Sequence, residues 1–359
     1  MLMKNLICYI LVFFFFLGSF SNGTGQVTGF TLDHFKPGST QSEIPLFHEE
    51  SPIEVTFSTD LRTLIFDVGD KRESHPATLT YQEGTDTITL EVMLKTRGNF
   101  RRARATCDFP PLRVEFDKDT LPGMLFSGMK DVKMVTHCRD RKLNQRYILE
   151  EYLIYKIYNL FTDLSYKVRL AKVTYIDTKE RIKPIHQFAF FIEPTGKMAA
   201  RNGGREIELK GLALNYINHP IINLFTIFQY FIANTDWSIR ALHNVKMISF
   251  SSEPMAIPVP YDFDFSGVIS TYYSVPDSAL GIASVRVRLF RSNCRKTEEL
   301  ETTFELFREK KQQIYDLYRN FPYLEEKRVK KILQYYDEFY ETIIDEKDAR
   351  RAFEQCTDH

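Results

Sequence analysis

The sequence predicts an α+β fold in which a β-rich N-terminal part precedes a mainly helical C-terminal part. Apolar side chains recur at every second position over residues 53–57, 77–81 and 87–96, the period of a strand with one buried face. They recur at every third and fourth position in four longer stretches, as in helices with one buried face. These stretches are residues 143–161, 220–233, 298–319 and 324–344. The balance between the two periods changes near residue 195, where we place the boundary between residues 45–195 and residues 196–359.

The remaining elements follow from local signals. Further short strands are expected at residues 64–66, 112–116, 132–135, 168–176, 186–192, 245–248 and 256–261. The strand at 186–192 ends before Pro194, which cannot donate a ladder hydrogen bond. Gly196, Gly203 and Gly204 predict a loop after it, and residues 252–254 predict a turn. The two charged helices after residue 297 predict an antiparallel pair that closes the chain.

Charge and composition argue against one class of partner. The chain has 359 residues, with 47 Lys and Arg against 47 Asp and Glu, so its formal net charge is zero. A nucleic-acid-binding protein would normally carry a basic excess. A hydrophobic content of 43% suffices for a sizeable core. We therefore predict a globular protein with no nucleic-acid partner.

The first residues resemble a secretory signal. Lys4 precedes an apolar run over residues 6–20, which is short for a membrane span, and small residues follow it. We expect cleavage after residues 1–21, then a flexible leader over residues 22–44, and a mature chain without an integral membrane span. The location predicted is secreted, periplasmic or in the cell envelope; an uncleaved anchor is the alternative.

Cysteine usage agrees with export. Cys8 lies inside the signal, and four cysteines remain: Cys107, Cys138, Cys294 and Cys356. An even number in an exported chain permits two disulfides, in any of three pairings. A zinc site is the alternative, but the chain has no Cys-x-x-Cys pair.

The most informative stretch is residues 228–267, where polar groups follow apolar runs. Asp236 comes after the helix at 220–233, Asn244 follows a short loop, and Asp262 and Asp264 follow the next strand pair. Carboxylate and amide oxygens are ligands for magnesium, and a further carboxylate could accept a hydroxyl proton. Helix capping and turn formation are the alternative roles for these residues.

Basic residues that could hold phosphate precede this stretch. The loop after residue 96 carries four arginines that could face an anion or lie in solvent: Arg97, Arg101, Arg102 and Arg104. Arg113 lies on the strand that follows, and an arginine can clamp a phosphate through two hydrogen bonds. Glu150 and Glu151 interrupt the apolar face of the helix at 143–161. They are either exposed residues or partners of a basic residue that holds phosphate.

The order carboxylate, amide, strand pair, carboxylate is similar to the catalytic core of kinase-like folds. Arg97-Gly98-Asn99, FPPLRVEFDK at 109–118, an acidic helix, Ile192-Glu193, NTDW at 234–237, HN at 243–244 and PYDFD at 260–264 extend the similarity. Over roughly residues 90–270 the chain resembles the CotH-type spore-coat kinases, an atypical kinase-like family that acts outside the cytoplasm.

This resemblance implies an atypical two-lobe kinase-like fold: a β-rich N-terminal extension and N-lobe at 45–195, and a C-lobe with a C-terminal helical pair at 196–359. It also implies ATP and Mg²⁺ as cofactors and a protein or small-molecule hydroxyl as acceptor. The residue roles that it implies are Asp236 as catalytic base, Asn244 and Asp262 as magnesium ligands helped by Asp264, Arg97 and Arg113 at the phosphates, Glu150 or Glu151 as the ion-pair partner of Arg113, and Glu193 near the adenine.

Two other functions stay open on the sequence. One is a catalytically inactive kinase-like protein that binds or supports structure at the envelope or surface, because free ATP is scarce outside the cytoplasm. The other is a metal-dependent hydrolase that uses Asp262 and Asp264. No paired-histidine or Gly-x-Ser-x-Gly motif supports zinc or serine chemistry.

Overall fold

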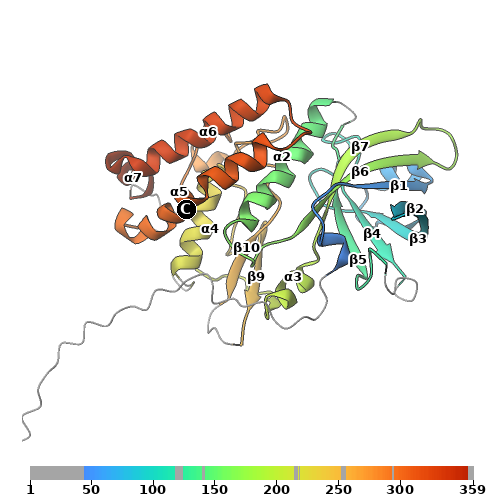
Figure 1. The fold of residues 1–359 in the computed structure, drawn as a ribbon, viewed down its shortest axis with the longest axis horizontal. Coiled ribbons are helices and arrows are strands. Elements are labelled where there is room, and N and C mark those ends of the chain that lie inside the picture. The colour runs from blue at the N-terminus through green and yellow to red at the C-terminus, as the bar shows by residue number, and fades with distance from the viewer. Residues whose placement is uncertain are drawn as a thin grey trace, which may run out of the picture. The chain divides into compact units, whose positions relative to one another are not determined.

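Seven strands close into a barrel in the N-terminal part of the chain (Figure 1). The computed structural model describes residues 44–117, 124–139, 142–213, 217, 219–251, 256–292 and 295–354. The barrel strands are β1 (Ile53–Thr59), β2 (His75–Glu83), β3 (Asp86–Thr96), β4 (Leu112–Phe116), β5 (Asp131–Val135), β6 (Val168–Asp177) and β7 (Ile185–Ile192). Their order around the barrel is β1-β2-β3-β4-β5-β7-β6.

The barrel closes where β1 pairs in parallel with β6, while its other neighbouring strands are antiparallel. Alternate residues of each strand point inward, as the period of two in the sequence predicts. Phe57 and Tyr175 are register partners at the closure and their rings stack at 6.2 Å. The barrel interior is therefore a packed aromatic and aliphatic core.

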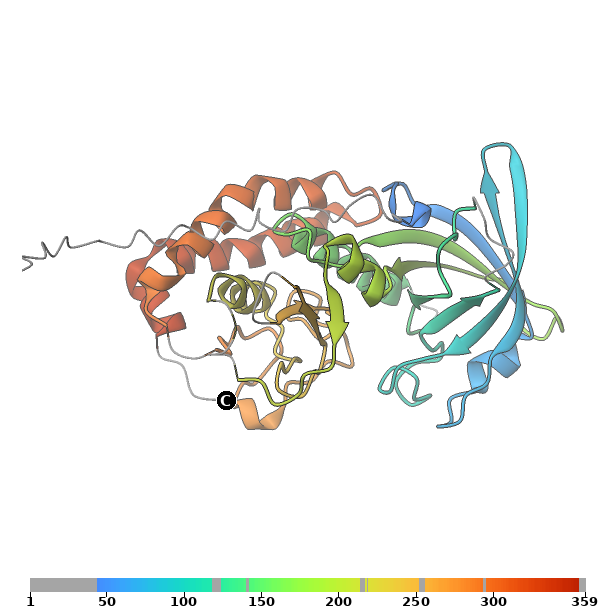
Figure 2. The same cartoon turned by 90° about the horizontal axis from the view of Figure 1, so that it is seen from below.

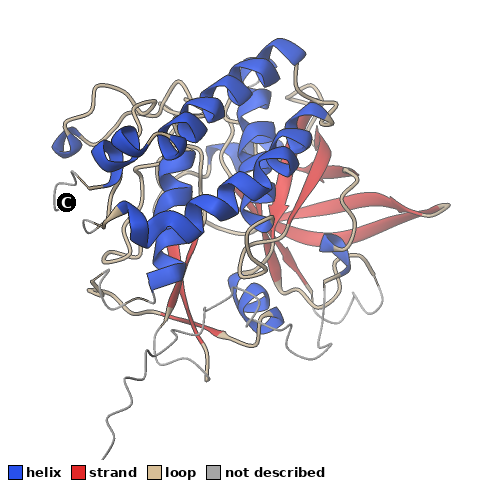
Figure 3. Ribbon diagram, turned by 60° about the vertical axis from the view of Figure 1, so that its left-hand side comes forward, coloured by secondary structure: helices blue, strands red, loops and turns tan. Residues whose placement is uncertain are grey.

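The longer helices lie together on one side of the barrel (Figures 2 and 3). They are α2 (Lys142–Asn159), α4 (His219–Phe231), α5 (Thr297–Arg319), α6 (Glu326–Ile344) and α7 (Glu346–Phe353). A small antiparallel sheet has the order β10-β9-β8, from β8 (Arg205–Ile207), β9 (Val245–Ser249) and β10 (Ile257–Pro260). The described residues thus form an α+β fold with a β-rich N-terminal region and C-terminal helices.

Aromatic side chains hold α4 against the C-terminal helices. Phe231 of α4 stacks on Tyr336 of α6 at 4.2 Å and meets Phe307 of α5 at 5.3 Å. All three rings are fully buried. Each such pair adds about 0.5–1.5 kcal/mol beyond the burial of its apolar area. The end of α4, from which the chain runs to Asp236, is therefore rigidly placed.

Three local predictions were wrong. Residues 64–66 belong to α1 (Leu61–Phe66) rather than to a strand, because the Asp60 side chain caps the helix by accepting from the backbone N–H of Thr63 at 3.0 Å. A helix, α3 (Thr195–Arg201), stands where Gly196 predicted the start of a loop. The expected pair of C-terminal helices is followed by a third helix, α7. The expected turn at 252–254 lies outside the described residues, as do the predicted signal and nearly all of the leader.

One of the predicted disulfides forms. Cys107 and Cys138 are joined, with their Cα atoms 4.6 Å apart. Cys294 and Cys356 lie outside the described residues. The bond ties the arginine-rich loop after β3 to the segment that follows β5. Within the described parts of the chain, no helix has the length and apolar character needed to cross a bilayer.

Candidate functional site

A cavity of about 420 Å³ brings the predicted stretch together with the arginine-rich loop. One wall comes from β4, β5 and the loop after β3. The other comes from the loop after α4 and the segment after β10. Its charged and amide side chains are Arg97, Asn99, Arg101, Arg113, Lys133, Asp236, His243, Asn244, Asp262 and Asp264. Four cations therefore share one cavity with three carboxylates.

Asp236 is held by the chain that leaves α4. Ala233 has a φ of 52° and turns the backbone out of the helix. The buried Asn234 side chain then accepts the backbone N–H of Asp236 at 3.0 Å, an Asx turn. The indole N–H of Trp237 donates to the carbonyl of Asn234 at 3.1 Å, and the ring packs edge-on against Phe225 at 4.9 Å. Asp236 is thus half-exposed, and it lies in the chain between two anchored residues, Asn234 and Trp237.

Both carboxylate oxygens of Asp236 have partners. Oδ1 lies 2.9 Å from Nε2 of His243, and Oδ2 accepts Nδ2 of Asn244 at 3.0 Å. The hydrogen bond to Asp236 raises the pKa of His243. Asn244 uses its amide nitrogen for Asp236, so its amide oxygen is the atom that could bind a cation.

The small sheet brings Asn244 and Asp262 together. Asn244 directly precedes β9 and Asp262 lies two residues after β10, and the antiparallel pair places both at the same end. The backbone N–H of Tyr261 donates to the carbonyl of Asn244 at 3.1 Å. Asn244 and Asp262 have φ angles of 53° and 62°, a left-handed conformation that is uncommon for side-chain-bearing residues. Such strained positions cluster at functional sites.

Asp264 faces a different partner. It is buried, and the hydroxyl of Tyr273 donates to its Oδ2 at 2.9 Å. Burial, followed by the charge of Asp262, raises the pKa of Asp264 to about 7. Asp264 is therefore tied to the segment around Tyr273 and is less suited than Asp262 to bind a cation directly.

The basic wall contains a residue that the sequence reading missed, Lys133 on β5. Arg113 on β4 and Lys133 are register partners, so their side chains stand next to each other on one face. Like charges placed in this way destabilise a sheet unless an anion compensates. Burial, with Arg97, Lys246 and Arg113 nearby, lowers the pKa of Lys133 to about 8. This wall is therefore built to receive negative charge.

The prediction that Glu150 or Glu151 is the ion-pair partner of Arg113 was wrong. Nε of Arg113 lies 3.5 Å from Oδ1 of Asp131, and its side chain is 40% exposed. Glu150 instead points toward α6, where Arg328 holds both its oxygens at 2.7 Å. Only Glu151 turns toward the site: it lines the smaller cavity that adjoins the first. The two consecutive glutamates lie on different faces of α2, so one is structural.

Glu151 is buried and its Oε1 has no hydrogen-bond partner in the structure. Burial raises the pKa of Glu151 well above its ordinary value, and Asp264 and Asp262 add to this, while Arg101 and Arg97 oppose it. A buried polar atom without a partner is costly, so this oxygen is open to a hydrogen-bond donor or a cation in the smaller cavity.

The carboxylate of Glu193 forms an ion pair with an arginine side chain. Arg201 of α3 donates Nε to Oε1 at 3.0 Å and Nη2 to Oε2 at 2.9 Å. Glu193 Oε2 also accepts the backbone N–H of Lys167 at 3.0 Å. The adjoining cavity holds about 30 Å³ between Tyr166, Tyr261 and the segment around Glu193.

The arginine-rich loop divides between the two possibilities raised by its sequence. Arg97 and Arg101 line the cavity, and Arg101 is buried with its guanidinium bonded to the carbonyl of Thr136. Arg102 lies outside, 3.6 Å from Asp70, and Arg104 stacks over Phe66 at 4.1 Å. Lys133 lies in the Val-Lys-Met-Val strand before an acidic helix, a signal that could have found it.

The donor set fits magnesium bound together with phosphates. Among the described residues, no group of three or more His, Cys, Asp or Glu side chains is arranged to hold a metal ion alone. Magnesium usually takes one or two protein ligands, with phosphate oxygens and water completing its shell. Asn244 and Asp262 offer one amide and one carboxylate beside a basic wall, which matches this requirement.

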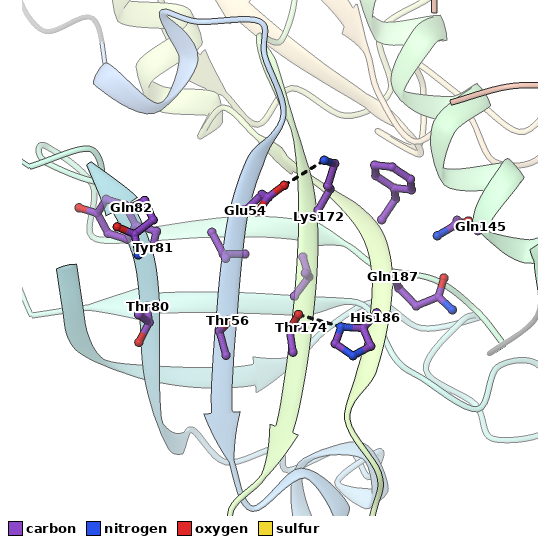
Figure 4. Close-up of a pocket in the computed structure, with 13 residues that line it drawn as sticks. Glu54, Thr56, Thr80, Tyr81, Gln82, Gln145, Lys172, Thr174, His186 and Gln187 are labelled. Carbon is purple, nitrogen blue, oxygen red and sulfur yellow. Dashed lines mark hydrogen bonds and ion pairs between the residues drawn. The ribbon is translucent and has the colours of Figure 1, made fainter. Parts of the chain in front are cut away.

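A second hollow, of about 480 Å³, lies on the outer face of the barrel across β2, β1, β6 and β7 (Figure 4). Thr56 and Thr174, and then Thr174 and His186, are register partners in a polar row. Its charges neutralise each other, since Nζ of Lys172 lies 2.9 Å from Oε1 of Glu54. It therefore lacks the opposed basic and acidic walls of the first cavity.

Comparison with protein-family models and with curated proteins finds no match to this chain.

Proposed function

We propose that this protein is a phosphotransferase that acts outside the cytoplasm, with ATP and Mg²⁺, on a protein or small-molecule hydroxyl. The observation that carries the proposal is the single cavity in which Lys133 and Arg97 face Asp236, Asn244 and Asp262. Phosphoryl transfer needs cationic clamps, an oxygen-ligated metal and a carboxylate near the acceptor. Each of these has a candidate in the cavity.

The proposed roles follow the order of elements. In protein kinases a strand lysine holds the nucleotide phosphates and forms an ion pair with a glutamate of the next helix. Lys133 on β5 and Glu151 on the next helix, α2, would take these two roles. Both side chains line the smaller cavity, which supports a kinase-like two-lobe fold of the CotH type. Arg97 and Arg101 would add positive charge along the phosphates. Arg113 would contribute only from the rim, because Asp131 shares its charge.

Asp236 would accept the proton of the acceptor hydroxyl. Its carboxylate is half-exposed at the cavity, and His243 and Asn244 hold its two oxygens in a fixed orientation. Asn244 and Asp262 would hold magnesium, which when bound neutralises phosphate charge. The Cys107–Cys138 disulfide supports an oxidising compartment.

The test is calorimetric titration of the protein with ATP, with and without Mg²⁺, followed by transfer of labelled γ-phosphate to the protein itself. We expect binding that requires Mg²⁺, its loss in Asp262→Asn, and retained binding without transfer in Asp236→Asn. Asp316→Asn, an exposed carboxylate on α5, is the matched control and should behave as wild type. Equal binding by wild type and Asp262→Asn overturns the proposal.

A second candidate function is a kinase-like binding protein without transfer activity. One observation favours it: the cavity beside Glu193 is only about 30 Å³, too small to admit a purine ring without opening. This candidate predicts no ATP-dependent heat in the titration and no labelled product.

A further inference from the structure

The loop that carries Asp236 is held from outside by one arginine. Nη1 of Arg291 donates to the carbonyl of Thr235 at 2.5 Å and to the carbonyl of Trp237 at 2.8 Å. These are the two residues that flank Asp236 in the chain. One charged donor therefore fixes the peptide groups on both sides of the proposed base.

The same guanidinium lies over the indole of Trp237, 5.0 Å from the ring centroid. A cation over an indole face is attracted to it, and the contact is stronger when it is partly shielded from water. Trp237 is itself buried against Phe225. Arg291 thus joins a loop whose other anchors, Asn234 and Trp237, belong to the loop itself.

The segment that supplies Arg291 also reaches the second acidic loop. Nη1 of Arg286 donates to the carbonyl of Gly267 at 3.3 Å, just after the aspartates. Arg288 turns the other way, to the carbonyl of Tyr335 and to Glu338 of α6. Three arginines of one short segment therefore connect both halves of the site to the C-terminal helices.

We propose that Arg291 is a positioning residue for Asp236: by holding the carbonyls of Thr235 and Trp237, it aims the carboxylate at the acceptor hydroxyl. This inference rests on the proposed function of the cavity. Charge-assisted hydrogen bonds to backbone carbonyls are stronger than neutral ones, so one side chain can fix the loop. A displacement of about 1 Å of a catalytic group can cost about 100-fold in rate.

The chain offers a direct reporter of this loop, because Trp237 is its single tryptophan. In Arg291→Ala, we expect the emission of Trp237 to move to longer wavelength and its quenching by acrylamide to increase. The kcat for phosphate transfer should fall about 100-fold, with the KM for ATP within twofold of wild type. Arg291→Lys should restore most of both signals, since one ammonium group can also donate to two carbonyls.

Arg288→Ala is the matched control. It removes an arginine of the same segment that stacks on Tyr335 and pairs with Glu338, without touching the Asp236 loop. We expect it to lower stability while leaving Trp237 quenching and kcat near wild type. If Arg288→Ala and Arg291→Ala change both signals equally, Arg291 is only structural and the inference is wrong.

The two arms separate this inference from the proposed function. A wild-type protein that transfers no phosphate overturns the proposed function, and with it the catalytic part of the inference. The fluorescence of Trp237 in the three variants then still decides whether Arg291 holds the loop. Unchanged quenching in a folded Arg291→Ala protein overturns the positioning role in either case. If Arg291→Ala does not fold, Arg291→Lys replaces it, and a kcat as low as that of Asp236→Asn also contradicts the inference.

Discussion

The hydroxyl oxygen of Tyr155 accepts the backbone N–H of Asp262 at 2.8 Å. This bond joins α2 to the proposed metal-binding loop at a residue whose φ is 62°. Tyr155 is buried, and two residues of the same helix face two different places: Glu151 the cavity and Glu150 α6. The helix therefore positions both a phosphate-side glutamate and the backbone of a metal ligand.

Replacing Tyr155 by Phe should weaken magnesium-dependent ATP binding and lower the free energy of unfolding by about 0.5–1.5 kcal/mol, because the partly buried N–H of Asp262 loses its acceptor. Calorimetric titration and urea unfolding would measure the two effects. Tyr158→Phe on the same helix is the control: it is equally buried, and its replacement should leave ATP binding unchanged. An equal loss of binding in both variants would contradict the role of Tyr155.

Gly267 is expected to tolerate no side chain. A Cβ at this position would lie 2.2 Å from the carbonyl oxygen of Val285 and 2.8 Å from Cβ of Ala233. Gly267→Ala should therefore push the loop that carries Gly267 away from the backbone at Val285 and from Ala233 at the end of α4. We expect it to destabilise the fold by about 1–3 kcal/mol and to reduce ATP binding.

Gly196→Ala serves as the comparison, since nothing lies within 4 Å of a Cβ there and the residue is in α3. We expect this substitution to stabilise the protein by about 0.5–1 kcal/mol. Thermal unfolding of both variants checks the pair. A Gly267→Ala protein as stable as wild type would show that the two loops are not packed as described.

The disulfide should stabilise the arginine-rich loop. Cys107 and Cys138 are 31 residues apart, for which loop closure predicts about 4 kcal/mol. The double substitution of both cysteines by Ser should lower the free energy of unfolding by this order. It should also weaken ATP binding, because Arg97 and Arg101 lie on the tethered loop. Urea unfolding with and without a thiol reductant tests this: the reductant should destabilise wild type more than it destabilises the double variant, which keeps Cys294 and Cys356.

His137 should make the fold sensitive to acid. It is buried against Phe109, with ring centroids 4.4 Å apart, and burial lowers its pKa to about 3 from an ordinary 6.5. The unfolded chain therefore binds this proton at a higher pH than the folded chain does. The contribution is fully present above pH 6.5 and falls by about 1.4 kcal/mol per pH unit below it, until pH is near 3.

Urea unfolding at pH 7, 6 and 5 would measure this slope. His137→Phe should flatten it, whatever its effect at pH 7, whereas replacing the exposed His186 by Gln should not. A slope that stays the same in His137→Phe would place the acid sensitivity in other groups.

Periodicity predicted most elements correctly where one face of a strand or helix is buried. It failed at residues 61–66, where Leu61, Leu64 and Ile65 are the buried side chains of a short capped helix. A run of three apolar residues cannot distinguish a strand from such a turn of helix. The prediction of a loop from its glycines failed at Gly196. One glycine in a helix costs only about 1 kcal/mol, and α3 buries Met198 and Ala199.

By itself, the sequence determined the alternation of the barrel strands, the amphipathic helices and the types of residue able to hold a metal and accept a proton. These depend on local spacing, which a sequence contains. Which cation faces the acids was decided only by the tertiary structure. Register places Lys133 beside Arg113, Asp131 shares the charge of Arg113, and Arg328 removes Glu150 from the site while Glu151 turns inward. Such choices arise from contacts between residues as far apart as Glu150 and Arg328, and no local pattern in the sequence encodes them.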